Sequence, residues 1–255
     1  MLNRVRAVIA VATLVVAFGA PAALASRPAP PPKPAALLIG DSLTVEAGPM
    51  WKLILGHRGV VPEQHSFGGT APCDWFGDIE STVATLRPAV VVFSFVGTTL
   101  TPCTRGSHGE PLLPDALAAR YHADAERATE LAGRFGATVV WTTGPVPATP
   151  LPGYWQIRAA FEDVARTHSR TRYVDGDELI APHGMYAETQ PCLFFEPCEA
   201  AGQNRVRAPD GIHFCPLSVP SPVEQIDGRC RVYSSGATRY GIVLANPVLR
   251  ALGWL

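Results

Sequence analysis

Short apolar runs alternate with longer amphipathic segments along most of this 255-residue chain. Residues 36–39, 89–95 and 138–142 are almost entirely apolar or β-branched, which is typical of strands buried on both faces. Segments with helical spacing lie between them, including 74–86 and 113–134. Where strands and helices alternate in this way, the strands run parallel and helices cover both faces of the sheet. The sequence therefore predicts an α/β fold with a central parallel sheet of about five strands.

The rest of the chain is less sharply patterned. Residues 175–210 lack periodicity and contain prolines, glycines and two cysteines, so we expect a long irregular loop there. Nothing reads as a linker between two folded units, which predicts a single domain. Further helices are expected at 50–55, 155–167 and 235–252, and further strands at 60–61 and 172–174.

The charge balance narrows the classes of partner. Twenty-one Lys and Arg residues against 22 Asp and Glu residues leave a net charge of −1. Proteins that bind nucleic acid or anionic membranes need a clustered excess of basic side chains. We therefore expect no nucleic-acid partner, and we expect the protein to be a monomer.

The amino terminus has the features of an export signal. Arg4 and Arg6 precede an apolar run at 7–20, and small residues at 23–25 offer a cleavage site before Ser26. The apolar run is shorter than the roughly 20 residues of a transmembrane helix, so we expect no stable membrane insertion after cleavage. An uncleaved anchor is the alternative, and both interpretations place the domain outside the cytoplasm.

A proline-rich spacer follows this signal. Five of the eight residues at 27–34 are proline, which favours stiff, extended chain. We therefore divide the sequence into a signal peptide at 1–25, a spacer at 26–34 and one folded domain at 35–255.

Six cysteines lie in the folded domain. An even number in an exported protein indicates disulfides, and six cysteines allow fifteen pairings. A zinc site is the competing interpretation, because His213 and Cys215 lie close together in the sequence. No C-x-x-C pair supports it, so we expect no metal.

The first strand stops abruptly at Gly40-Asp41-Ser42, and a helix-compatible segment follows. A strand-to-helix turn of this kind lies at the carboxyl edge of the sheet, where open α/β folds bind ligands. The amino terminus of the helix leaves unpaired N–H groups nearby. A serine there can act as a nucleophile if a base takes its proton. A turn with a helix cap is the alternative, because Asp and Ser both favour cap positions.

A base for this serine is available before the last helix. Asp210 precedes His213 by three residues across a glycine-containing turn, so its carboxylate can fold back onto the imidazole N–H. The carboxylate would hold the imidazole tautomer and stabilise the imidazolium that forms when Ser42 loses its proton. Two glycine turns, at 68–70 and 97–99, follow the second and third strands and fall at the same edge of the sheet.

Four short blocks therefore meet at one edge of the predicted sheet. They are Gly-Asp-Ser-Leu at 40–43, Gly-Gly-Thr at 68–70, Gly-Thr-Thr at 97–99 and Asp-Gly-Ile-His at 210–213. Together they resemble the SGNH (GDSL-type) hydrolases, over about residues 36–252. The resemblance implies a three-layer α/β/α, flavodoxin-like fold. Thr-Pro-Cys at 101–103 and the run at 210–216 are similar, more narrowly, to an exported actinobacterial branch of that family.

The resemblance also implies roles for individual residues. Ser42 would be the nucleophile, His213 the general base and then acid, and Asp210 the group that orients the imidazole. The oxyanion hole of the family takes the N–H of the nucleophile and a glycine N–H from the second block. Gly68 fits that glycine best, and Gly69 is the alternative.

The third block departs from the family pattern. Thr99 stands where the family has an asparagine whose side chain completes the oxyanion hole. A threonine hydroxyl is shorter than an amide and its rotamer is stiff. Losing one oxyanion donor costs about 2.7–4 kcal/mol of transition-state stabilisation. The departure predicts a slower esterase, a rearranged hole or a degenerate member.

The cysteines lie close to these blocks. Cys73 follows the glycine block and Cys103 follows Thr99, so a bridge between them would brace the two oxyanion loops. A bridge from Cys215 would hold the histidine loop. The alternative is that the bridges only stabilise an exported protein with long loops. The expected pairs are Cys73–Cys103, Cys192–Cys198 and Cys215–Cys230.

The combined interpretation is a secreted or envelope-associated serine esterase or lipase that cleaves carboxylic esters through an acyl-enzyme on Ser42. It needs no cofactor, and its partner is a small-molecule or cell-envelope ester. An acyltransferase that uses the same serine is one alternative. A non-catalytic envelope-binding protein on a degenerate scaffold is the other, and its motive is Thr99.

Overall fold

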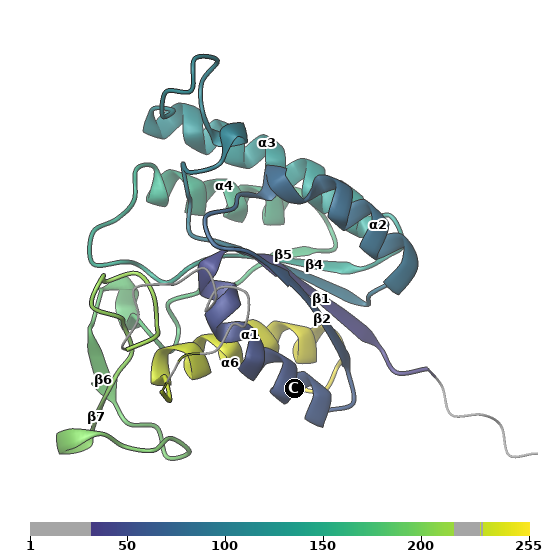
Figure 1. The fold of residues 1–255 in the computed structure, drawn as a ribbon. Helices are drawn as coiled ribbons and strands as arrows, with labels where there is room; N and C mark the ends of the chain where they lie inside the picture. Colours follow the sequence, from purple (N-terminus) through teal and green to yellow (C-terminus); the bar gives the residue numbers. More distant parts are fainter. Residues whose placement is uncertain (1–31, 217–229, 231) are drawn as a thin grey trace, which may run out of the picture. The chain divides into compact units, whose positions relative to one another are not determined.

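Five parallel strands form the central sheet, in the order β2-β1-β3-β4-β5. The computed structural model describes residues 32–216, 230 and 232–255 (Figure 1). The strand order is that of flavodoxin-like doubly wound folds. In these folds the order in which strands are added to the sheet reverses between β1 and β3. The strands are β1 (Ala35–Gly40), β2 (Val61–Ser66), β3 (Val90–Phe95), β4 (Thr138–Thr143) and β5 (Thr171–Tyr173).

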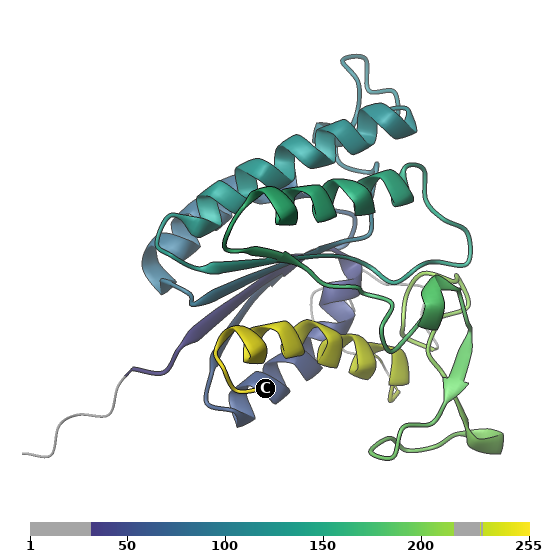
Figure 2. The same ribbon diagram turned by 180° about the vertical axis from the view of Figure 1, so that it is seen from behind.

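Helices cover both faces of the sheet, which confirms the predicted three-layer α/β/α class (Figures 1 and 2). Successive residues of β1 point to opposite faces. Leu38 packs in the cluster under α1 and α6, whereas Leu37 and Ile39 pack in the cluster under the other helices. One layer holds α1 (Ser42–His57) and α6 (Ser235–Ala251), and the other holds α2 (Phe76–Leu86), α3 (Pro114–Gly133) and α4 (Tyr154–Thr167).

Two elements near the start of the domain are longer than predicted. The expected helix at 50–55 is part of α1, which begins at Ser42 because the Asp41 side chain caps it by accepting a hydrogen bond from the N–H of Leu43. The expected strand at 60–61 is β2, which continues to Ser66. β2 pairs with β1 along its whole length. This pairing stabilises the strand although its polar residues give no strand pattern in the sequence.

The expected irregular loop at 175–210 is wrong in part, because it contains a two-stranded antiparallel sheet of β6 (Thr189–Pro191) and β7 (Gln203–Arg205). The loop between the two strands is closed by a disulfide. Its Glu196 forms a buried ion pair with Arg239 of α6, at 2.6 Å. A short-range disulfide and an ion pair to a distant helix hold this segment, so short strands form here without periodicity in the sequence.

The predicted signal peptide at 1–25 and all but the last residues of the spacer at 26–34 lie outside the described residues. Residues Lys33–Leu255 make one compact unit. Within the part of the chain that the structure describes, none of the helices is both long and apolar enough to span a membrane.

Gly40, the last residue of β1, lies close to the backbone of β3 because it has no side chain. This close approach gives a prediction about stability. A Cβ on Gly40 would lie 2.3 Å from the carbonyl oxygen of Ser94, a backbone atom that cannot move aside. We expect Gly40→Ala to lower the free energy of unfolding by about 1–3 kcal/mol in a denaturant titration, because overpacking strains the core.

A matched control lies in α1. A Cβ on Gly56 meets nothing within 4 Å. Gly56→Ala is expected to raise the free energy of unfolding by about 0.5–1 kcal/mol, because alanine loses less backbone entropy in a helix. Equal stability of the two variants would contradict the steric argument.

Candidate active site

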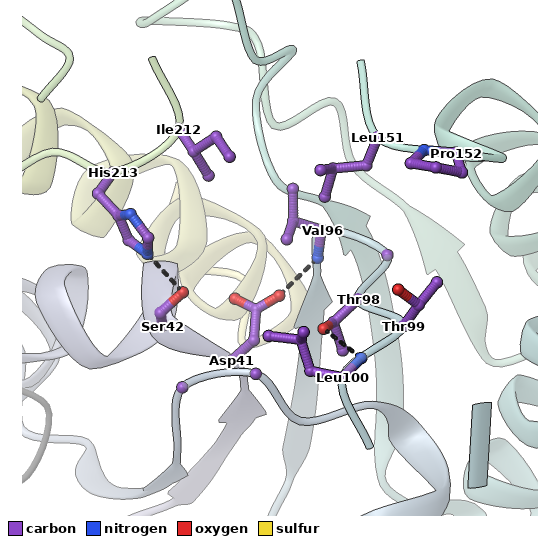
Figure 3. Close-up of a pocket in the computed structure, with 13 residues that line it drawn as sticks. Asp41, Ser42, Val96, Thr98, Thr99, Leu100, Leu151, Pro152, Ile212 and His213 are labelled. Carbon is purple, nitrogen blue, oxygen red and sulfur yellow. Dashed lines mark hydrogen bonds between the residues drawn. The ribbon is translucent and has the colours of Figure 1, made fainter. Parts of the chain in front are cut away.

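Ser42 is the first residue of α1, two residues after the end of β1, at the carboxyl edge of the sheet. Its Oγ lies 2.8 Å from Nε2 of His213 (Figure 3). The histidine comes from the loop before α6, so the fold brings together two residues that are far apart in the sequence. A serine nucleophile requires a base within hydrogen-bonding distance, and the imidazole of His213 lies at such a distance from Ser42.

The turn that carries His213 is built around Asp210. Oδ2 of this carboxylate lies 2.5 Å from Nδ1 of the imidazole, and Oδ1 accepts hydrogen bonds from the N–H groups of Ile212 and His213, at 2.9 and 3.0 Å. Gly211 has a φ of +74°, a conformation that favours glycine, and it lets the turn fold back on itself. The structure thus aligns Ser42, His213 and Asp210 in series.

The charges around this series shift the pKa values of His213 and Asp210 in opposite directions. Burial alone would lower the pKa of His213, but the hydrogen bond that the imidazole donates to Asp210 and nearby negative charges outweigh it and raise that pKa above 6.5. Burial acts to raise the pKa of Asp210, yet the hydrogen bonds from His213 and from the N–H of Ile212 bring it down to about 2. The aspartate is therefore ionised at neutral pH and stabilises a proton on the imidazole.

A pocket of about 330 Å³ opens beside Ser42 and His213. Apolar side chains make up much of its wall, and Figure 3 shows Leu151 and Ile212 across the pocket from Asp41. Such a cavity suits an apolar group placed next to a few polar atoms. It is lined by Asp41, Ser42, Gly68, Gly69, Val96, Gly97, Thr98, Thr99, Leu100, Leu151, Pro152, Ile212 and His213.

The three predicted oxyanion groups all line this pocket. Among the described residues, neither the N–H of Ser42 nor that of Gly68 donates a hydrogen bond. Both are therefore available to an oxyanion. Thr99 contributes to the opposite wall, and Figure 3 shows it on the far side of Val96 from Ser42.

Asp41 does more than cap α1. Its buried carboxylate accepts hydrogen bonds from the N–H of Leu43, at 3.1 Å, and from the N–H of Val96, at 2.6 Å. It thus ties the turn that carries Ser42 to the loop after β3. Burial raises the pKa of Asp41 to about 6, against the lowering effect of these two N–H groups. The Gly-Asp-Ser motif signals the cap, but the contact with Val96 depends on strand pairing.

The six cysteines form the three expected pairs, Cys73–Cys103, Cys192–Cys198 and Cys215–Cys230. The first bridge joins the chain just after the glycine block to the chain just after Thr99. Thr101 reinforces the same junction through a 2.6 Å hydrogen bond to Asp74. Since Cys215 is bonded to Cys230, its sulfur is not a thiolate that could bind zinc with His213.

The comparisons with known proteins bear on the fold. No protein-family model and no curated protein matches the chain. A solved lipase/acylhydrolase from Enterococcus faecalis is similar with a TM-score of 0.55 and 14% identity, over 84% of this chain and 95% of its own. The structure of TesA is similar with a TM-score of 0.51 and 16% identity, over 86% and 99%. The chain therefore has the three-layer fold of SGNH (GDSL-type) acylhydrolases.

Proposed function

We propose that this protein is a serine hydrolase of the SGNH type that cleaves carboxylic esters through an acyl-enzyme on Ser42. The observation that carries the proposal is the series of two short contacts, 2.8 Å from Ser42 Oγ to His213 Nε2 and 2.5 Å from His213 Nδ1 to Asp210 Oδ2. The lipase/acylhydrolase fold of a solved neighbour supports the same chemistry by analogy.

The geometry suits acyl transfer in two steps. Oγ of Ser42 attacks the ester carbonyl carbon while Nε2 of His213 takes the hydroxyl proton. The N–H groups of Ser42 and Gly68 stabilise the oxyanion that forms. His213 then returns the proton to the alcohol as the C–O bond breaks, which leaves the acyl group on Ser42. Water then attacks the acyl carbon while His213 takes one of its protons. The bond between the acyl group and Oγ of Ser42 breaks, His213 returns the proton to Oγ, and the carboxylic acid leaves.

The pocket walls indicate the part of the ester that is recognised. Leu100, Leu151 and Ile212 give the cavity an apolar lining that suits an acyl chain. We infer an extracytoplasmic location, secreted or associated with the cell envelope, because three disulfides suit an oxidising compartment. The substrate in the cell would then be a small-molecule or envelope ester.

Labelling and turnover test the proposal together. The purified protein is expected to hydrolyse p-nitrophenyl esters in an acyl-chain series and to be labelled at Ser42 by a fluorophosphonate, with the adduct mapped by mass spectrometry. Absence of both would favour a non-catalytic binding protein. Labelling together with transfer of the acyl group to an added alcohol in preference to water would favour an acyltransferase.

Substituting Thr99 measures how complete the oxyanion hole is. We expect Thr99→Asn to raise kcat on p-nitrophenyl esters by about tenfold or more, because a longer amide supplies the third donor that the hole lacks. Thr99→Ala should change kcat less than threefold, because the threonine hydroxyl is shorter than an amide and its rotamer is stiff. A large loss in Thr99→Ala would instead show that the hydroxyl already serves as a donor.

A further inference from the structure

A second carboxylate reaches the histidine loop from α1. Glu46 lies four residues after Ser42, so the two side chains leave the helix on the same face. Its Oε2 accepts a 2.6 Å hydrogen bond from the N–H of Phe214, the residue that follows His213. The N–H of Cys215 also stabilises the ionised form of Glu46. One helix therefore carries the serine and holds the backbone next to its base.

A buried cation holds the other side of the same loop. The guanidinium of Arg207 donates hydrogen bonds to the carbonyl oxygens of Ile212, at 2.8 Å, and Val146, at 2.9 Å. Burial lowers the pKa of Arg207 to about 10, which leaves it charged at neutral pH. Ile212 and Phe214 flank His213. The cation Arg207 therefore holds the residue before the histidine, and the anion Glu46 holds the residue after it.

The backbone of Phe214 is held at its carbonyl as well. Ser234, the cap of α6, donates a 2.7 Å hydrogen bond to that oxygen. The Phe214 ring is fully buried, with its centroid 5.2 Å from that of Tyr240. Both backbone polar groups and the ring of Phe214 are therefore occupied, so the residue next to His213 is held in one position.

We propose that Glu46 is a positioning residue for the hydrolase reaction: its carboxylate aims His213 at Ser42 through the backbone of Phe214 and favours the imidazolium that forms when Ser42 gives up its proton. The proposal rests on the proposed function. It goes beyond the triad by assigning a second acidic group to the base, one that comes from the helix of the nucleophile.

Three negative charges face His213 from different elements. Asp210 lies on its own turn, Glu46 comes from α1 and Asp41 caps α1, and all three act to raise the pKa of the imidazole. Burial raises the pKa of Glu46 itself, and the charge of His213 and the N–H of Phe214 oppose that rise. Arg207 lies on the other side of the loop, where it contacts the Ile212 carbonyl.

The test is the pH dependence of kcat/KM for p-nitrophenyl ester hydrolysis by Glu46→Gln. Glutamine keeps an oxygen that can accept from Phe214 but removes the charge. Since His213 works as a base only when neutral, we expect the acid limb of the profile to move down by about one pH unit and the plateau to fall by up to about tenfold. NMR titration of the His213 ring should show the same downward movement.

Glu46→Asp is the second variant, because it keeps the charge and shortens the reach to Phe214. We expect an acid limb close to that of the wild type and a lower kcat. This variant carries the test alone if Glu46→Gln does not fold. A limb that moves as far in Glu46→Asp as in the glutamine variant would overturn the proposal.

Asp124→Asn is the matched control, because it removes a buried carboxylate that pairs with Arg120 on α3, outside the pocket lining. Its acid limb should match the wild type. An unchanged limb and plateau in folded Glu46→Gln would overturn the positioning role while leaving the hydrolase proposal intact. Unchanged activity in Ser42→Ala, measured in parallel, would instead remove the proposed function itself.

Discussion

Ser42→Ala is expected to lower kcat for p-nitrophenyl esters by a factor of about 10⁶. The alanine methyl group cannot form the acyl-enzyme, and His213 no longer has a hydroxyl proton to take. Burst kinetics on a wild-type preparation, compared with the variant, measure the effect directly. Labelling by a fluorophosphonate should disappear with the activity.

The fold should survive this substitution. The Ser42 hydroxyl forms its hydrogen bond with His213 in a half-buried position, and the helix cap belongs to Asp41. The melting temperature is therefore expected to stay near that of the wild type. Ser81→Ala, at an exposed serine of α2, is the control and should keep full activity. Wild-type turnover by Ser42→Ala would contradict the acyl-enzyme mechanism.

Asp210→Asn is expected to lower kcat by a factor of about 10⁴. The amide oxygen can still accept a hydrogen bond from Nδ1 of His213, but the amide does not carry the negative charge that stabilises the imidazolium. The pKa of His213 should fall as well, because its strongest partner loses its charge. Measured pH profiles should therefore show a lower plateau together with an acid limb displaced to lower pH.

Asp175→Asn supplies a matched control for that variant. Asp175 is also a partly exposed turn aspartate that accepts an N–H two residues ahead, from Asp177 at 3.0 Å. Its carboxylate pairs with Arg158, at 3.1 Å, instead of with a histidine. Its loss should leave kcat within about twofold of wild type. A similar fall in both variants would mean that turn geometry, and not the charge beside His213, accounts for the effect.

Much of the fold follows from local patterns. The apolar β-branched residues of β3 and β4 can only be satisfied between two layers of helices, so the three-layer class was predictable. The extent of α1 was not, because its first turn carries no periodic signal and begins where the Asp41 side chain caps it. The strands β6 and β7 depend on a disulfide and on the buried pair of Glu196 with Arg239.

The candidate site divides in the same way. Ser42, Asp210 and His213 are visible in the sequence because each lies in a short turn whose chemistry is local. Glu46 and Arg207 carry no such signal: a glutamate inside a helix and an arginine two residues before a proline read as solvated side chains. Their roles come from contacts with the backbone of distant residues.

The sequence by itself predicted the order of the central strands and their helices, the edge of the sheet where the candidate residues gather, and the serine and histidine that we propose as nucleophile and base, because periodicity and turn chemistry are local properties. Only the tertiary structure decided how His213 is held and which groups line the pocket beside Ser42. Those depend on atoms brought within about 3 Å by packing of helix on sheet. Position along the chain does not encode such proximity, so Glu46, Arg207 and the wall opposite Ser42 emerged only from the folded molecule.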